Sequence, residues 1–236
     1  MKTNELVGIA HQPKGSSMTT LLHIDASARS SSRSLSRQLS AHFVSTWMAR
    51  RPSDNVIARD VGRNPPPITT ELWIASVFTA EGERTDEQRD AVRASDEFIS
   101  EVDQADIIVM GTPMYNYGMP AALKAWFDNV IRIGKTFTFD LTRGDYPLKP
   151  IMTGKTLVIL SSRGEFGFEP GGIREDINHL ETHIRTCAPY LGVEETHLVS
   201  IDYQEFGDER HELSVKMAYE AVPQLVELLQ NKRGNA

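Results

Sequence analysis

The sequence predicts a doubly wound α/β domain, in which helices cover both faces of a five-stranded parallel sheet. Five short apolar runs alternate with five stretches of helical periodicity between residues 19 and 230, and this order is the one that builds such a sheet. Residues 156–160 (TLVIL) form a continuous apolar run, which is typical of a strand buried on both faces. We therefore expect a single domain over residues 19–230.

The first expected strand is 21–24. The helix after it has apolar residues at every fourth position, namely Leu35, Leu39, Phe43 and Trp47, and this spacing places them on one helix face. Residues 56–58 are the second expected strand. The stretch 61–80 contains three consecutive prolines at 65–67, so we expect it to be a long irregular connection.

Residues 85–103 are expected to form a charged helix, because Thr85 and Gln88 have the spacing of a capping box. A third strand over 107–110 follows. Pro120 then begins the next helix, at a position where its missing N–H would have no helical partner. The apolar face of that helix consists of Leu123, Trp126, Phe127, Val130 and Ile131.

After the strand 156–160, apolar residues three or four apart predict a helix over 173–187. Residues 193–201 are the fifth expected strand, and residues 209–230 are the last helix. Pro223 lies inside this helix and is expected to kink it or divide it in two, because proline removes a helical hydrogen bond.

Composition excludes several classes of protein. Charged residues make up 24% and apolar residues 40% of the chain, which is ordinary for a globular domain and excludes wholesale disorder. Cys187 is the only cysteine, so an internal disulfide framework is excluded. The net charge of −7 argues against a nucleic-acid partner, and no apolar stretch reaches the ~18–20 residues of a membrane span.

Residues 1–18 lack the apolar core of a signal peptide. We expect them to form a flexible N-terminal extension, and we expect the protein to be cytoplasmic.

In doubly wound sheets, ligands bind at the carboxyl ends of the strands, which directs attention to three loops. The first, 25–34, has five serines and two arginines, Arg29 and Arg33. Serine hydroxyls and the N-terminus of the following helix suit an anion such as phosphate. The loop lacks the GxxxxGK[ST] and GxGxxG patterns of nucleotide sites, and a plain polar turn that caps the helix is the alternative interpretation.

The second loop, 111–120 (GTPMYNYGMP), combines two tyrosines, a methionine and Asn116 between fixed Gly and Pro positions. These side chains suit the face and polar edge of a flat heterocycle, although a rigid turn packed on the core is the alternative. The third loop, 161–172 (SSRGEFGFEPGG), has four glycines. Gly164 would let the backbone approach a ligand closely, and a flexible surface connection is the alternative.

Together, these loops resemble those of the FMN-dependent NADH:quinone oxidoreductases, also called NADH-azoreductases, which have the flavodoxin-like fold. The resemblance covers about residues 19–230 and is most specific over Pro113–Phe139. It implies that the FMN phosphate is bound by Ser27, Ser32, Arg33 and Ser34. It implies that the flavin ring lies along Met114, Tyr115, Asn116 and Tyr117. It also implies that the pyrimidine side of the ring contacts Ser162, Arg163 and Gly164.

The resemblance implies a ping-pong reaction in which hydride passes from NADH or NADPH to N5 of tightly bound FMN and then to a quinone or azo compound. No side chain is implied as an obligatory acid or base, and Asn116 and Tyr117 line the ring. The family forms homodimers with sites at the subunit interface, which makes Tyr117, Phe137 and Tyr190 candidate walls of the substrate pocket. A flavodoxin-type electron carrier that docks a protein partner is the alternative function, and a flavin-free module on the same fold is a second.

One position departs from the family pattern. The family's turn usually reads SRGG, whereas this chain has Glu165 at the fourth position, and we expect its carboxylate to point outward. The sequence does not choose between NADH and NADPH, because Arg29, Arg143 and Arg163 could each bind a 2′-phosphate.

Other candidate sites are set aside. His179 and His183 are four residues apart, but no third ligand accompanies them, so no metal site is predicted. Cys187 falls on an apolar helix face and is expected to be a buried small hydrophobe. Trp73, in the Pro-rich connection, is expected to cover either a partner subunit or the substrate pocket. The dimer contact and the acceptor pocket are expected in 61–80 and 140–154.

Overall fold

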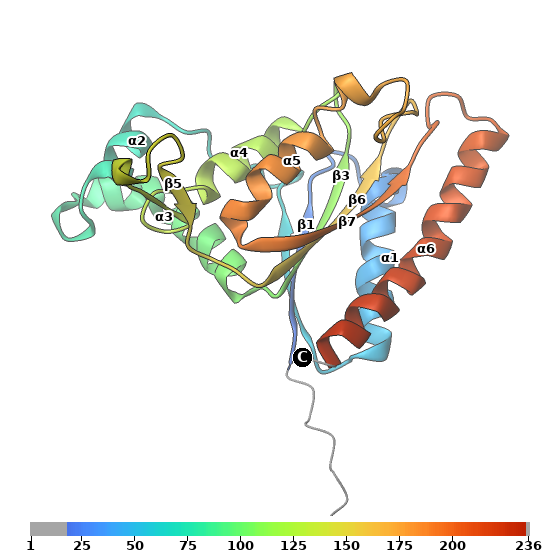
Figure 1. Ribbon diagram of the computed structural model, residues 1–236, viewed down its shortest axis with the longest axis horizontal. Coiled ribbons are helices and arrows are strands. Elements are labelled where there is room, and N and C mark those ends of the chain that lie inside the picture. The colour runs from blue at the N-terminus through green and yellow to red at the C-terminus, as the bar shows by residue number, and fades with distance from the viewer. Residues whose placement is uncertain (1–17, 235–236) are drawn as a thin grey trace, which may run out of the picture.

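The computed structural model describes residues 18–234; apart from Met18, the expected N-terminal extension lies outside them. Its main sheet has five strands in the order β2-β1-β3-β6-β7, and all four neighbouring pairs are parallel (Figure 1). The strands are β1 (Thr20–Asp25), β2 (Asn55–Asp60), β3 (Ile107–Pro113), β6 (Lys155–Ser162) and β7 (Val193–Ile201). The predicted fold class is therefore confirmed.

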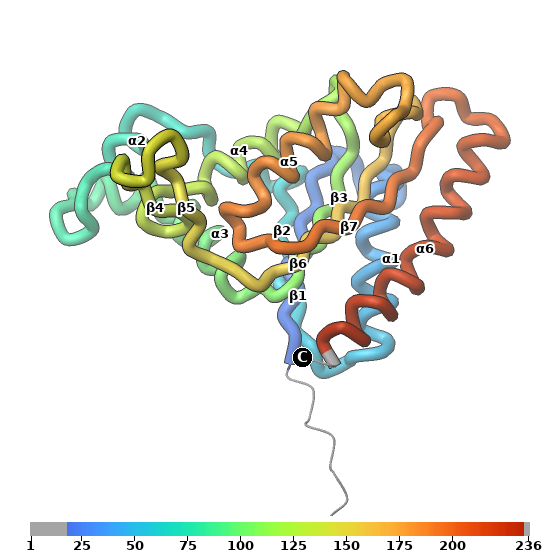
Figure 2. Tube along the Cα trace, in the orientation of Figure 1, coloured from blue at the N-terminus to red at the C-terminus, as the bar shows by residue number. Residues whose placement is uncertain are grey.

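Helices cover both faces of this sheet (Figures 1 and 2). One face carries α1 (Leu35–Arg50) and α6 (Glu209–Gly234), and the other carries α3 (Asp86–Gln104), α4 (Ala121–Val130) and α5 (Glu181–Cys187). Alternate residues of each strand supply the two cores. In β3, Ile107 and Val109 pack toward α1 and α6, whereas Ile108 and Met110 pack toward the opposite layer.

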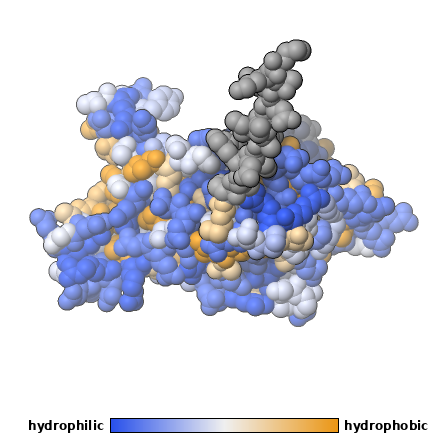
Figure 3. Space-filling view, turned by 90° about the horizontal axis from the view of Figure 1, so that it is seen from below, coloured by the Kyte–Doolittle hydropathy of each residue, from blue (hydrophilic) through white to orange (hydrophobic). Residues whose placement is uncertain are grey.

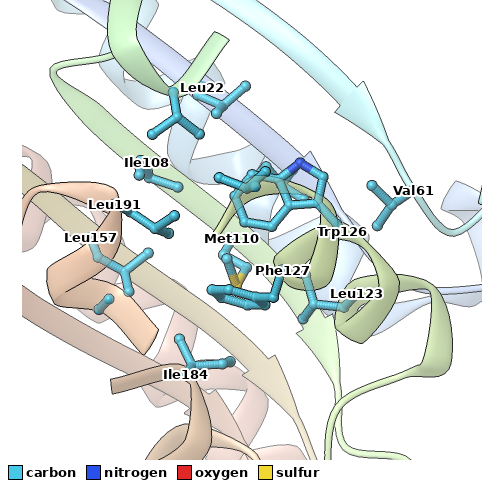
Figure 4. Packing of buried hydrophobic residues seen from close by; sticks show 14 of the residues in the cluster. Leu22, Val61, Ile108, Met110, Leu123, Trp126, Phe127, Leu157, Ile184 and Leu191 are labelled. Carbon is cyan, nitrogen blue, oxygen red and sulfur yellow. The ribbon is translucent and has the colours of Figure 1, made fainter. Parts of the chain in front are cut away.

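The core between the sheet and α3–α5 is the larger of the two clusters (Figure 4). Trp126 and Phe127 of α4 meet edge to face, with ring centroids 5.1 Å apart, and both are buried against the sheet. Burying a large apolar side chain contributes about 1.5–3 kcal/mol relative to exposing it. This layer therefore fixes the start of α4, and with it the loop that joins β3 to α4.

One element lies where irregular chain was expected, and a hairpin lies where no element was predicted. Helix α2 (Glu71–Phe78) occupies part of the connection 61–80; it begins where the Thr70 hydroxyl accepts a hydrogen bond from the Trp73 amide. Strands β4 (Phe137–Phe139) and β5 (Leu148–Pro150) form an antiparallel hairpin. The expected irregular connection was wrong over α2, because the three prolines end before the helix starts.

The last two helices also differ from their predictions. Helix α5 covers only 181–187 of the expected 173–187. Ile173 is 78% exposed, so the apolar period before α5 does not mark a buried face, and the Asn178 side chain accepts from the amides at 180 and 181 where the helix starts. Helix α6 runs through Pro223 undivided, so a kink is the part of that expectation that stays a prediction; Val222 and Val226 on either side of the proline are fully buried in the core.

Helix α2 and the hairpin lie together at one end of the molecule, at the left in Figures 1 and 2. Apolar surface gathers toward this end in the space-filling view (Figure 3). Within residues 18–234, no helix is both long enough and apolar enough to cross a bilayer.

Candidate functional site

Two hollows open at the carboxyl ends of β1, β3 and β6. The first, of about 320 Å³, lies between the loops after these strands and the start of α1. The second, of about 470 Å³, lies beside the loop after β3. Both are lined by Met114, Gly164 and Glu205, so they form one continuous cleft at the place that the strand-end rule predicts.

The loop after β1 lines the first hollow with Ser27, Arg29, Arg33 and Ser34. Ser34 is the N-cap of α1, and its hydroxyl accepts from the Arg37 amide at 3.4 Å. The hollow thus lies at the positive end of a 16-residue helix, where unpaired amides and the helix dipole favour an anion. Ser32 lines neither hollow; its exposed hydroxyl lies 3.3 Å from that of Ser30.

Arg37, in the first turn of α1, anchors the loop after β1. Its guanidinium is buried and donates to the two Asp60 carboxylate oxygens at 2.6 and 2.7 Å and to the Ser27 carbonyl oxygen at 2.5 and 3.1 Å. The hydrogen bond to Asp60 raises the pKa of Arg37, although burial opposes it. The sequence analysis missed Arg37 because it counted only residues of the loop itself.

The loop after β3 turns back on itself under strain. Tyr115 and Gly118 exchange two backbone hydrogen bonds of 3.0 Å, and between them Asn116 and Tyr117 have left-handed backbones, with φ of 47° and 66°. Such a conformation costs a non-glycine residue about 1–3 kcal/mol and persists where the surroundings impose it, often at functional sites. Here the His179 amide holds the turn by donating to the Tyr117 carbonyl at 2.9 Å.

The structure places the four predicted ring-contacting residues of this loop along the cleft. Tyr115 lines the first hollow, Asn116 and Tyr117 line the second, and Met114 lines both. The Tyr117 ring lies 6.4 Å from that of Phe168 across the second hollow. This arrangement offers aromatic and thioether surface with one amide, and no charge, on the β3 side of the cleft.

In the turn after β6, Ser162 and Gly164 line the cleft, whereas Arg163 between them does not. Ser162 and Gly164 line the first hollow. Arg163 lines neither hollow; its buried guanidinium lies 2.9 Å from Glu181 and 3.6 Å from Asp202. Burial raises the pKa of Asp202, and the charge of Arg163 only partly offsets this. The Arg163 side chain is therefore committed to a buried ion cluster under the turn.

The expected outward orientation of the Glu165 carboxylate stays a prediction, because the residue lines the cleft while its carboxylate pairs with Arg174, which lines neither hollow. Glu165 lines the second hollow and forms an ion pair of 2.9 Å with Arg174. Arg174 is held in place because its amide donates to the Gly167 carbonyl at 2.7 Å and its guanidinium donates to the Phe166 carbonyl at 3.1 Å. The cation across the loop therefore positions the carboxylate.

A fourth segment, residues 202–206 after β7, completes the cleft and was missed by the sequence analysis. Three backbone hydrogen bonds tie residues 203–205 to residues 163–165. The Phe166 and Tyr203 rings stack 4.5 Å apart. As a result, Gln204, Glu205 and Phe206 line the cleft. The signal was available, because the strand-end rule applies to the last strand as well.

The other candidate residues lie elsewhere. Phe137 and Tyr190 form a T-shaped pair, with centroids 5.6 Å apart, and line neither hollow. Arg143 donates to two carbonyls of the hairpin. Cys187 is half-buried, and burial raises the pKa of its thiol. Among residues 18–234, no group of three or more His, Cys, Asp or Glu is arranged to hold a metal ion.

Comparisons with known proteins agree with this geometry. A family described as having the flavodoxin-like fold matches residues 19–225. An FMN-dependent NADH:quinone oxidoreductase of Colwellia psychrerythraea is 55% identical over 218 residues, which is 90% of this chain and 100% of the relative. A protein of the same name from Idiomarina loihiensis is 52% identical and covers 85% of this chain and 86% of its own length.

Solved structures show the same fold at low sequence identity. An azoreductase from Bacillus anthracis superposes with a TM-score of 0.79 at 22% identity, covering 89% of this chain and 99% of its own. An FMN-dependent NADH-azoreductase from the same species, solved in complex with FMN, has a TM-score of 0.79 at 16% identity, with 90% and 99% coverage.

Proposed function

Because the chain belongs to the family of FMN-dependent NADH:quinone oxidoreductases, we propose that it is an enzyme that reduces quinones and azo compounds at the expense of NADH or NADPH. The chemistry that FMN supplies when bound is two-electron hydride transfer, from reduced nicotinamide and then to the acceptor. The observation that carries the proposal is the continuous cleft, which joins a serine- and arginine-lined anion site to an aromatic wall.

The first hollow fits the phosphate end of FMN. Ser27, Arg33 and Ser34 would hold the phosphate, together with the amides at the start of α1. Hydroxyl groups, guanidinium groups and a helix N-terminus are a donor set suited to a dianion. Ser32 is the one implied phosphate ligand that lies outside the hollow, so we assign it a smaller part in binding.

The region where the two hollows meet fits a flat ring. Met114, Tyr115, Asn116 and Tyr117 would lie along the ring, and Ser162 and Gly164 would approach it from the other side. A Cβ atom at Gly164 would come within 2.5 Å of the Glu205 side chain, so a larger residue at this turn would displace Glu205, whereas glycine leaves the backbone open to a ligand. We assign the second hollow, farther from the anion site, to the nicotinamide and the acceptor in turn.

We also propose that the enzyme is a homodimer, as the family resemblance implies, and that α2 and the hairpin form its contact. These elements line an apolar groove of about 420 Å³ that includes Trp73 and Phe137. Phe78 is 74% and Phe139 50% exposed beside it. Contiguous exposed apolar surface of this kind marks an interaction site. A cytoplasmic location is part of the proposal, because reduced nicotinamide is available there.

Steady-state kinetics test the function. We expect the FMN-loaded protein to oxidise NADH or NADPH when benzoquinone or an azo dye is present. A yellow protein that oxidises neither nicotinamide would point to the electron carrier instead. Absence of flavin absorbance after reconstitution with excess FMN would favour a module without flavin.

A further inference from the structure

We propose that the second hollow selects against anionic electron acceptors and that the Glu205 carboxylate sets this selection. The inference rests on the proposed function, because it assigns the second hollow to the acceptor. It goes beyond that function by naming the charge class of the preferred substrate, which is uncharged.

The charges that line the second hollow are all negative. Its lining contains two carboxylates, Glu165 and Glu205, and no lysine, arginine or histidine. The remaining lining side chains are the aromatic rings, Met114 and the Asn116 amide. An aromatic acceptor therefore meets apolar walls and a negative rim.

Of the two carboxylates, Glu205 is the one without a compensating charge. Glu165 is neutralised by Arg174 at 2.9 Å. The Glu205 carboxylate has no hydrogen bond or ion pair among residues 18–234. Its charge is therefore weakened only by solvent and salt, and not by a paired cation.

The backbone of Glu205 is held in place, and its side chain is exposed. Its amide donates to the Gly164 carbonyl at 3.0 Å, and its Cγ lies so close to Gly164 that a Cβ there would approach within 2.5 Å. Phe206, the next residue, packs against the Phe166 ring at 5.8 Å. The backbone pairing thus keeps Glu205 at the junction of the two hollows, both of which it lines.

Nearby cations do not cancel this charge. Arg163 is buried against Glu181 and Asp202, and Arg210 pairs with Asp208 at 2.5 Å. Arg29 and Arg33 line the first hollow, which Glu205 also lines, but not the second, and the FMN phosphate held by Arg33 would offset their charge there. An anionic acceptor would therefore find repulsion and no counter-charge.

Coulomb's law gives the size of the effect. Two like unit charges about 7 Å apart, at an effective dielectric constant of about 20–80, disfavour binding by a factor of about 3–50. The repulsion also weakens with salt, because the Debye length falls from ~30 Å at ~0.01 M to ~8 Å at ~0.15 M.

The test compares 1,4-naphthoquinone with 1,4-naphthoquinone-2-sulfonate as acceptors for the FMN-loaded wild type, Glu205→Gln and Glu209→Gln. Glu209 is exposed, lines neither hollow and serves as a matched loss of one charge. The intrinsic reactivity difference between the two quinones is common to all three proteins, so it cancels. We expect the ratio of kcat/KM for neutral over sulfonated quinone to fall about 3–50-fold in Glu205→Gln and to stay at the wild-type value in Glu209→Gln.

A second readout does not depend on turnover. Equilibrium dialysis of the oxidised, FMN-loaded proteins against naphthalene-2-sulfonate and naphthalene-2-methanol measures binding of an anionic and a neutral aromatic compound. Relative to the wild type, we expect Glu205→Gln to raise the affinity for the sulfonate over that for the alcohol by a similar factor. We expect added salt to reduce the preference of the wild type for the alcohol. Unchanged dialysis ratios in Glu205→Gln would overturn the inference. Failure of every protein to oxidise NADH or NADPH with the neutral quinone would instead overturn the proposed function.

Discussion

Removal of the Arg37 guanidinium tests whether this side chain holds the loop after β1 in the conformation that forms the anion site. Arg37→Met keeps much of the buried stem but removes the cation that pairs with both Asp60 and Asp25, leaving Asp60 only the longer 3.8 Å contact with Arg63. It also leaves the Ser27 carbonyl without its donors. Breaking a buried ion pair by removing one partner costs about 3–5 kcal/mol. The Asp60 side chain is 28% exposed, so we expect a loss near the lower end, about 3 kcal/mol.

Urea unfolding measures this loss, and a double-mutant cycle assigns it. Asp60→Asn in the Arg37→Met background removes one of the two carboxylate charges that Arg37 pairs with, so the double variant should lose less stability than the sum of the single variants, by about 0.5–3 kcal/mol. FMN titration of the same proteins should show weaker binding, by about 3–10-fold, because the loop is no longer held in its binding conformation. A loss of stability below about 1 kcal/mol, with FMN affinity unchanged, would show that Arg37 does not anchor the loop.

Four further predictions concern the site, the interface and the acid stability. Ser34→Ala should weaken FMN binding by about 1–3 kcal/mol, because it removes a donor to a charged group. Ser32→Ala should weaken FMN binding less. Equal losses of affinity in an FMN titration would contradict the placement of the two hydroxyls. Asn116→Ala should weaken FMN retention or slow flavin reduction, and unchanged flavin content and turnover would remove Asn116 from the site. Phe78→Glu should shift sedimentation toward the monomer, since a charge is added to the apolar groove; an unchanged dimer would locate the contact elsewhere. Burial acts to raise the pKa of Asp54, but its hydrogen bonds outweigh burial and hold that pKa below the usual value. The stabilisation is therefore present at neutral pH and is lost as pH falls below about 4; urea unfolding of Asp54→Asn should show a shallower acid decline than the wild type.

The sheet and most of the helices could be predicted from the sequence, because the spacing of apolar residues indicates which face of each element is buried. The run TLVIL becomes β6, whose central residues are fully buried, and the capping box at Thr85 and Gln88 forms as predicted. Helix α2 was missed because three prolines dominate its surroundings, although its cap at Thr70 is local. The extent of α5 was overestimated because apolar periodicity does not reveal which face is covered.

The site was harder to predict wherever tertiary contacts decide orientation. The Glu165 carboxylate is positioned by its ion pair with Arg174, nine residues later. Arg163 turns inward because its guanidinium forms a buried ion pair with Glu181 of α5. Glu205 reaches the cleft through backbone pairing between two loops. None of these contacts has a spacing signature, so motif reasoning found the loops but not the direction of each side chain.

In the proposed function, the cleft holds FMN in a position to take hydride from nicotinamide and pass it to a quinone. Anaerobic stopped-flow measurement of the two half-reactions tests this proposal most directly. Mixing the FMN-loaded protein with NADH or NADPH should bleach the visible flavin absorbance, and adding benzoquinone should restore it, each at a rate at least equal to steady-state turnover. Flavin absorbance that persists with both nicotinamides, or that fails to return with the quinone, would contradict the account.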